Sequence, residues 1–197
     1  MTEATVPFRA GREGYASYRI PAVVVTAEGT LLAFCEGRVR SASDHGHIDI
    51  VLKRSTDGGR TWGPLQVAAD NGTGLAGNPA PVVLDSGRVL LVHVRNAASA
   101  SEEAIRLGKV KDADGRRVWV QHSDDDGLTW SSPVEITKSV KKAGWRWYAT
   151  GPGHAVQLST GRIVVPANRT APQGGRQHSN EPRFSSHCLF SGPPGLR

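Results

Sequence analysis

Ser55-Thr56-Asp57-Gly58-Gly59-Arg60-Thr61-Trp62 recurs, 123 − 55 = 68 residues later, as Ser123-Asp124-Asp125-Asp126-Gly127-Leu128-Thr129-Trp130. Both stretches have the form S-x-D-x-G-x-T-W. The short Asp side chain can accept hydrogen bonds from backbone N–H groups of its own turn, and Gly supplies a positive φ. We expect the Thr and Trp to begin the next strand, with the Trp ring buried as an anchor. The motif therefore predicts a strand–turn–strand unit that repeats along the chain.

A third copy of this motif is incomplete. Adding 68 residues once more leads to Ser191, and Gly195 follows four positions later, but Pro193 stands where the Asp is expected. We interpret this as a third repeat that is broken off near Ser191, through truncation or a reading-frame error.

Short apolar and β-branched runs repeat in the same order around each copy. Pairs of such runs, separated by a turn containing Gly, read as β-hairpins at 19–34, 79–94 and 153–166. About four strands per repeat is the pattern of a β-propeller blade, so residues 1–197 are predicted to form one all-β propeller domain. Residues 1–14 are expected to be a loose lead-in and residues 171–197 a degenerate tail. The long segment 96–117 reads as a loop with one helical turn.

Composition limits the function classes. The chain has 24 Lys and Arg against 18 Asp and Glu, a formal charge of +6, which favours anionic partners. The basic residues are scattered and no RNA-binding motif occurs, so we expect no nucleic-acid partner. No apolar stretch is long enough for a membrane span and no signal peptide is evident, which predicts a cytoplasmic protein without membrane insertion. Cys35 and Cys188 are expected to be free thiols, and the oligomeric state stays open.

The first repeat contains charged side chains that the strand and turn pattern does not require. Arg19 begins a strand that otherwise reads as buried, and a buried charge needs a partner. Arg38 follows the second strand of the same hairpin, so both guanidinium groups could reach one end of the blade. Asp44 lies in the loop before the third strand. Asn78 stands at the matching strand start of the second repeat, and we expect it to face the same pocket.

These residues lie in stretches that resemble the exo-α-sialidases. Tyr18-Arg19-Ile20-Pro21 resembles the F/Y-R-I-P motif of that family, and Glu36-Gly37-Arg38 followed by the loop at Asp44 resembles its second arginine and acid/base loop. Residues 147–154 also resemble a family stretch. The resemblance runs from about Val6 to Arg169 and implies a six-bladed β-propeller, of which this chain covers about the first three blades. In this family the repeated motif is known as the Asp box, which unrelated propellers share.

The resemblance implies hydrolysis of terminal α-linked sialic acids from glycans, with a sialylated glycan as the partner and with no metal or organic cofactor. A planar guanidinium donates two parallel hydrogen bonds to a carboxylate such as that of sialic acid. Arg19 and Arg38 would be two members of a three-arginine cluster that binds it. Asp44 would protonate the leaving oxygen and then activate water. The Asp-box residues are assigned to structure: Ser55, Asp57, Gly59, Trp62, Ser123, Asp125, Gly127 and Trp130.

The catalytic set implied by the family is not complete in this sequence. Sialidases use a Tyr nucleophile, but Tyr15, Tyr18 and Tyr148 do not lie in the nucleophile's context. That Tyr, its Glu base and the third arginine come from later blades in the family. We therefore expect this chain alone to be inactive. Linkage preference and hydrolase versus trans-sialidase behaviour stay open.

Structural interpretations of the same residues also stay open. Arg19 and Arg38 could simply pair with Glu36 or Asp49, and Asp44 could serve as a turn-former. His45 and His47 could ligate a metal, but no third ligand has suitable spacing, so solvated loop histidines are expected. Trp147, Tyr148 and His154 are expected to be core or rim residues. At the level of function, the alternative to an enzyme is a non-catalytic Asp-box propeller segment that binds glycan or protein.

Overall fold

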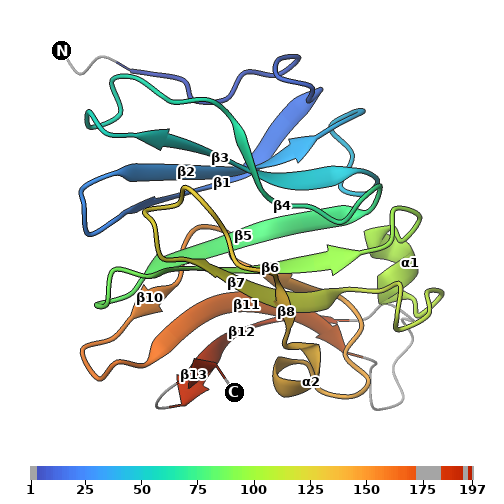
Figure 1. Ribbon diagram of the computed structural model, residues 1–197. Helices are drawn as coiled ribbons and strands as arrows, with labels where there is room; N and C mark the ends of the chain where they lie inside the picture. Colours follow the sequence, from blue (N-terminus) through green and yellow to red (C-terminus); the bar gives the residue numbers. More distant parts are fainter. Residues whose placement is uncertain (1–3, 172–182, 193–194, 197) are drawn as a thin grey trace.

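The computed structural model describes residues 4–171, 183–192 and 195–196, and three sheets account for most of them (Figure 1). The first sheet pairs its strands as consecutive antiparallel neighbours. The second repeats this pattern, and one parallel pair, Ile48↔Leu75, joins it to the first. The first sheet comprises β1 (Ser17–Val25), β2 (Leu31–Arg38), β3 (Ile48–Ser55) and β4 (Gln66–Ala69), and the second β5 (Leu75–Val83), β6 (Val89–Asn96), β7 (Arg117–Ser123) and β8 (Val134–Glu135).

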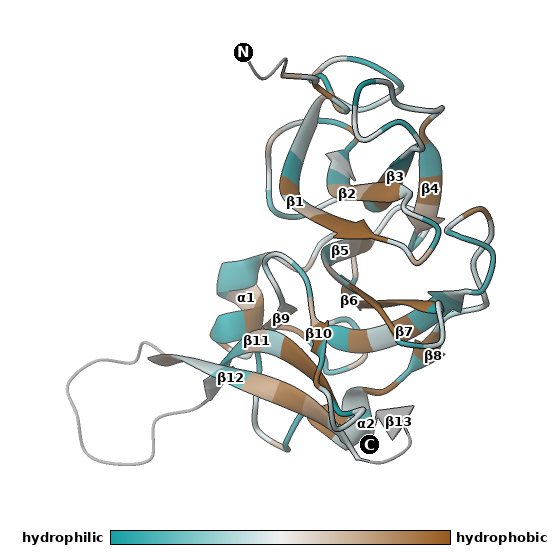
Figure 2. Cartoon of the chain, turned by 90° about the vertical axis from the view of Figure 1, so that its left-hand side faces the viewer, coloured by the Kyte–Doolittle hydropathy of each residue, from teal (hydrophilic) through white to brown (hydrophobic). Residues whose placement is uncertain are grey.

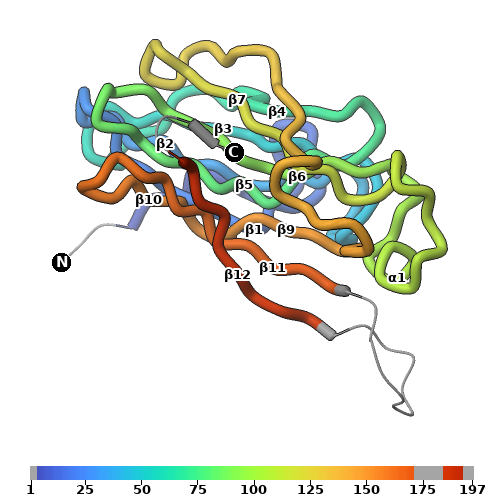
Figure 3. The backbone as a smooth tube through the Cα atoms, turned by 90° about the horizontal axis from the view of Figure 1, so that it is seen from below, coloured from blue at the N-terminus to red at the C-terminus, as the bar shows by residue number. Residues whose placement is uncertain are grey.

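The third sheet departs from the simple order of the other two. Its central strand pairs with two short strands on one side and with one long strand on the other. It comprises β9 (Tyr148–Thr150), β10 (Val156–Gln157), β11 (Ile163–Ala171), β12 (Arg183–Gly192) and β13 (Gly195–Leu196). Viewed from below, β11 and β12 run side by side (Figure 3). The predicted all-β propeller fold is confirmed, with three blade-like sheets.

The middle sheet is buried on both faces. Leu91 of β6 packs with Phe34 against the first sheet, while its neighbour Val92 packs with Val165 against the third. Successive side chains of a strand point to opposite faces. A strand between two sheets therefore needs a continuous apolar run rather than an alternating one. The apolar colouring of the strands in Figure 2 follows this arrangement.

Both complete Asp boxes close their turns through the Asp carboxylate. Thr61 N donates to Asp57 Oδ1 at 2.9 Å, and Thr61 Oγ1 donates to Oδ2 at 2.6 Å. Asp125 makes the same two contacts with Thr129. The hydrogen bonds from these threonines hold the pKa of Asp57 well below its usual range and lower the pKa of Asp125 to about 2. Gly59 has φ 86°, so a side chain there would be strained.

One expectation about the Asp box is wrong. The strands after the two boxes begin only at Gln66 and Val134, so the Thr and Trp of each motif precede the strand instead of opening it. Trp62 and Trp130 are half-buried, and Trp130 packs edge-on against Phe34 at 5.8 Å between ring centroids. The turn is therefore closed mainly by the carboxylate, with the indole as a partial cover.

Both ends of the chain contact the blades. In the lead-in, Thr5 Oγ1 accepts a hydrogen bond of 3.1 Å from Trp62 Nε1, so the described part of this segment is tied to the first Asp box. In the tail, which was expected to be degenerate, β12 pairs with β11. Residues 172–182 of this tail lie outside the described residues. The one-turn helix expected within 96–117 is confirmed as α1 (Glu102–Arg106), whereas α2 (Thr137–Val140) has no counterpart in the sequence-based prediction.

Neither helix in the described part of the chain has the length and apolarity that crossing a membrane requires.

Candidate functional site

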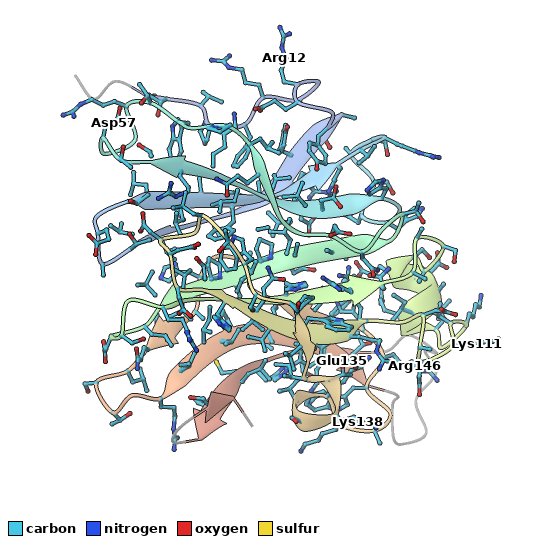
Figure 4. The ribbon with its side chains drawn as sticks, in the orientation of Figure 1. Arg12, Asp57, Lys111, Glu135, Lys138 and Arg146 are labelled. Carbon is cyan, nitrogen blue, oxygen red and sulfur yellow. The ribbon has the colours of Figure 1, made fainter. Side chains whose placement is uncertain are left out.

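A cavity of about 310 Å³ opens where the three sheets meet. It lies at the end of the sheets that carries α1, whereas the Asp57 turn lies at the opposite edge (Figure 4). Every sheet contributes to its lining, so the cavity depends on how the blades pack. Side chains that line it include Arg38 and Asp44 from the first blade, Asn78, Glu102 and Arg116 from the second, and Trp147 and Asn168 from the third.

Asp44 stands between two guanidinium groups at this cavity. Its Oδ1 atom lies 3.0 Å from Arg19 Nη1 and 2.6 Å from Arg38 Nη2. The three side chains that the sequence singled out are therefore brought together. They differ in exposure, because the Arg19 and Asp44 side chains are 48% and 59% exposed whereas that of Arg38 is only 3% exposed.

Most donors of Arg38 are engaged within the protein. Nε and Nη2 donate to Glu36 Oε2 at 3.2 and 2.7 Å, and Nη1 donates to the Ala42 carbonyl at 2.6 Å. A guanidinium has five N–H donors. Three of them donate to Glu36 and Ala42, and Nη2 also forms an ion pair with Asp44, so few remain for a ligand. The pairing of Arg38 with Glu36 that the sequence left open is thus present, while Arg19 pairs with Asp44 and with neither Glu36 nor Asp49.

Glu36 links the first two blades beneath the cavity. Its side chain is 4% exposed, and while Oε2 accepts from Arg38, Oε1 accepts a 2.9 Å hydrogen bond from the Asn78 backbone N–H. A buried carboxylate needs such partners on both oxygens. Gly77 makes the approach possible, because a Cβ at that position would lie 2.6 Å from Glu36 Oε1.

The first strand of each of the first two blades carries a bulge at the cavity. The register of β1 shifts between Arg19 and Ala22, and that of β5 shifts between Gly77 and Ala80. At these points Ile20 and Asn78 adopt φ of 57° and 55°. Positive φ is unusual for Asn and a genuine outlier for a β-branched residue. Bulges re-aim side chains, and here the two bulged residues, Ile20 and Asn78, both line the cavity.

Sequence reasoning missed the two bulges and the role of Arg116. The repeat Ile20-Pro21-Ala22 and Asn78-Pro79-Ala80 was an available signal for the paired bulges. Nothing in the sequence sets Arg116 apart from the other scattered basic residues. It is 3% exposed, its guanidinium lies 4.1 Å from the centre of the Trp147 ring, and its Nη1 donates to Asn78 Oδ1 at 3.1 Å. Burial lowers the pKa of Arg116 to about 10, so it is still charged at neutral pH.

The three tyrosines do not line this cavity. Tyr15 donates to Asp49 Oδ2 at 2.9 Å, Tyr18 donates to the Arg12 carbonyl, and the Tyr148 hydroxyl lies 3.0 Å from His187 Nε2. Burial raises the pKa of all three phenols, that of Tyr18 to about 12. Trp147 and Tyr148 are buried, as expected for core residues.

The two loop histidines have separate partners. His45 Nδ1 lies 2.8 Å from Ser43 Oγ, and His47 Nε2 lies 3.5 Å from Asp49 Oδ1. Within residues 4–171, 183–192 and 195–196 no group of three His, Cys, Asp or Glu side chains is arranged to hold a metal ion.

Comparison with known proteins identifies the class. The model of the BNR repeat-like domain family matches residues 29–197. The chain is 40% identical over 169 residues to an exo-alpha-sialidase of Aspergillus fumigatus, covering 78% of this chain and 42% of that protein. It is 36% identical over 171 residues to Sialidase-4 of Mus musculus, covering 83% of this chain and 35% of that protein.

Solved structures show the same fold. The structure of Hadza microbial sialidase Hz136 superposes with a TM-score of 0.79 at 27% identity, covering 92% of this chain and 36% of that one. Trypanosoma rangeli sialidase in complex with sialic acid superposes with a TM-score of 0.69 at 20% identity, covering 98% of this chain and 32% of that one.

The fold and these matches define a BNR-repeat β-propeller protein. Within that class, the chain belongs to the exo-α-sialidase family, as the motifs around Arg19 and Asp44 predicted. It spans less than half the length of the curated relatives that it matches, 42% in the case of the Aspergillus fumigatus protein.

Proposed function

We propose that the cavity is the glycone-binding and proton-donating part of an exo-α-sialidase site, which releases terminal α-linked sialic acids from glycans. The observation that carries this proposal is the position of the Asp44 carboxylate, which lies between Arg19 and Arg38 at the mouth of the cavity. The sialidase relatives support the reaction, and the sialic acid bound to Trypanosoma rangeli sialidase supports the ligand class.

In this proposal the two arginines have different tasks. Arg19 is half-exposed and uses one N–H on Asp44, so it retains a fork of donors for the substrate carboxylate. Arg38 is buried and held by Glu36 and Ala42, and its Nη2 pairs with Asp44, so its main task is to fix Asp44. Asn78 contributes a further contact with the sugar from the second blade.

Asp44 acts as the general acid and then as the general base. A carboxyl group in contact range of the glycosidic oxygen protonates the leaving group and afterwards accepts a proton from the attacking water. A general acid matters most when the leaving group is a poor one. In an enzyme that completes this set with the Tyr nucleophile, Asp44→Asn is therefore expected to slow the release of an alcohol far more than the release of an acidic phenol.

We further propose that these 197 residues bind the sugar without turning it over. The family mechanism needs a Tyr nucleophile, and Tyr15, Tyr18 and Tyr148 are engaged with Asp49, Arg12 and His187 away from the cavity. In this second proposal the isolated chain acts as a glycan-binding segment without catalysis. Its Arg19, Arg38 and Asp44 side chains nevertheless keep the arrangement of an enzyme site.

Titration of the purified chain with sialic acid, followed by NMR, tests the ligand. N-acetylglucosamine, which lacks the carboxylate, is the matched control ligand, and Arg60→Met is the matched control variant, because Arg60 lies in the first Asp box away from the cavity. Sialic acid should shift resonances around Arg19, and Arg19→Met should abolish the shifts while Arg60→Met preserves them. Equal binding by wild type and Arg19→Met would overturn the carboxylate assignment.

Incubation of the same chain with a fluorogenic sialoside tests turnover. We expect fluorescence release at the rate of the buffer control. Release above that rate, lost in Arg19→Met, would show that the chain supplies its own nucleophile and would contradict the second proposal.

A further inference from the structure

Arg116 is a buried cation without a carboxylate within bonding distance among the described residues. Its guanidinium is covered on one face by Trp147, at 4.1 Å, and its only described side-chain hydrogen bond is the 3.1 Å contact from Nη1 to Asn78 Oδ1. Its Nε atom is buried and has no partner among the described residues. Removing a charge from water is costly unless the charge is compensated. Arg116 nonetheless occupies the wall of the cavity rather than the surface.

Asn78 accepts this hydrogen bond through Oδ1. Its backbone N–H and carbonyl also have partners, so Nδ2 is its one polar atom without a partner among the described residues. Its backbone N–H donates to Glu36 Oε1 at 2.9 Å, and its carbonyl accepts from Thr150 Oγ1 at 2.6 Å. Its φ of 55° places it in the bulge of β5. Residues of all three blades thus fix Asn78 at the point where it lines the cavity.

The remaining polar atom is the side-chain nitrogen. An amide can rotate so that either its oxygen or its nitrogen faces a ligand, and its neighbours decide which. A guanidinium can only donate hydrogen bonds, so it cannot accept one from the amide nitrogen. Arg116 therefore selects the orientation in which Oδ1 points to the wall, and no described side chain accepts from Nδ2.

We propose that Arg116 is a positioning residue of the site, which fixes the Asn78 amide so that Nδ2 is presented to the cavity as a hydrogen-bond donor. This inference rests on the proposed function for the identity of the sugar. The wall at this point then recognises an oxygen of the sugar that accepts a hydrogen bond.

A double-mutant cycle separates this indirect role from direct binding. Asn78→Gly removes the amide and tolerates the positive φ, while Arg116→Met keeps an unbranched stem against Trp147 and removes the donor. Affinity for sialic acid should fall about tenfold in either single variant, as expected for a hydrogen bond of about 1.4 kcal/mol. If Arg116 acts through Asn78, the double variant should bind no more weakly than the single ones. Losses that multiply to about a hundredfold would overturn the proposal.

A ligand-free measurement tests the positioning by itself. The Asn78 side-chain amide signal, assigned by its loss in Asn78→Gly, should show ¹⁵N relaxation as rigid as the backbone in wild type and clearly mobile in Arg116→Met. Arg117→Met is the matched control, because Arg117 is the adjacent arginine and pairs with Glu135 at 2.7 Å outside the cavity. An amide that is equally rigid in Arg116→Met would refute the inference whether or not sialic acid binds.

A third variant covers the case in which Arg116→Met does not fold. Asn78→Asp keeps the size and the backbone preference, pairs its carboxylate with Arg116, and replaces the donor by an acceptor. It should fold like wild type and bind sialic acid at least tenfold more weakly. Wild-type affinity in Asn78→Asp would overturn the proposed donor. Failure of wild type itself to bind sialic acid would instead refute the proposed function and leave the relaxation result to decide the role of Arg116.

Discussion

Asp126→Asn should destabilise the protein by breaking a clamp between the first two blades. Asp126 lies in the second Asp box, yet its partners are in the first blade. Arg54 Nη2 of β3 lies 2.6 Å from Asp126 Oδ2, Arg54 Nε donates to the Asp126 carbonyl at 2.9 Å, and Thr30 Oγ1 donates to Oδ2 at 2.6 Å. The side chains of Arg54 and Asp126 are only 19% and 18% exposed.

The expected magnitude follows from this burial. Hydrogen bonds to a charged group contribute about 1.5–3 kcal/mol each, and breaking a fully buried ion pair costs about 3–5 kcal/mol. Asn keeps an acceptor oxygen and tolerates the φ of 62° at this position, so only the charge is lost. We therefore expect a loss of about 2 kcal/mol in the free energy of unfolding, or roughly 4–8 °C in Tm for a chain of this size.

Asp124→Asn is the matched control two positions earlier in the same motif. Asp124 also pairs with an arginine, Arg88, at 2.6 Å, but the two side chains are 56% and 43% exposed. Exposed pairs contribute little because water and salt screen them. Urea unfolding of the two variants, followed by circular dichroism, compares them directly. A loss in Asp126→Asn no larger than that in Asp124→Asn would refute the claim that this contact clamps the blades.

Three further predictions concern single groups. Gly77→Ala should lower the free energy of unfolding by about 1–3 kcal/mol, because its Cβ would lie 2.6 Å from Glu36 Oε1. Gly115→Ala is the control and should change stability little, because the atom nearest to its Cβ lies at 3.6 Å. Equal unfolding midpoints for the two variants would contradict this prediction. Burial lowers the pKa of His93 from about 6.5 in the unfolded chain to about 3 in the folded protein. Between these two pH values the unfolded chain binds one more proton than the folded protein. The free energy of unfolding should therefore fall by up to about 1.4 kcal/mol per pH unit as the pH is lowered from 6.5 towards 3. His93→Leu should reduce the dependence of the free energy of unfolding on pH in this range. An unchanged slope in that variant would contradict the assignment to His93. Burial also lowers the pKa of Lys141 to about 8, so its Nζ should titrate near pH 8 by NMR rather than near the usual 10.4.

The fold was predictable because its signals are local and repeated. The Asp boxes and the hairpins around Gly29 and Gly87 mark strand and turn positions within a few residues of one another. The position of the Thr and Trp was misjudged, since the motif does not reveal how many residues separate the turn from the next strand. That distance is set by packing between blades.

The candidate site was predictable in its first blade and, beyond that blade, only at Asn78. Arg19, Arg38 and Asp44 lie in family-like stretches of one repeat, and the structure brings them together. The roles of Glu36 and Arg116 depend on contacts with Asn78 of the second blade. Such contacts arise from the angle at which the blades pack, which leaves no trace in the sequence. They also depend on two backbone bulges, whose sequence signal is only the short repeat x-Pro-Ala at Ile20 and Asn78.

The most direct test of the account is a crystal structure of the chain with sialic acid bound. The account predicts the sugar in the cavity lined by Asp44 and Asn78, with its carboxylate on the Arg19 guanidinium and its anomeric oxygen within hydrogen-bond distance of Asp44. A sugar bound elsewhere, or bound in the cavity with its carboxylate pointing away from Arg19, would contradict the assignment of this cavity as a sialidase site.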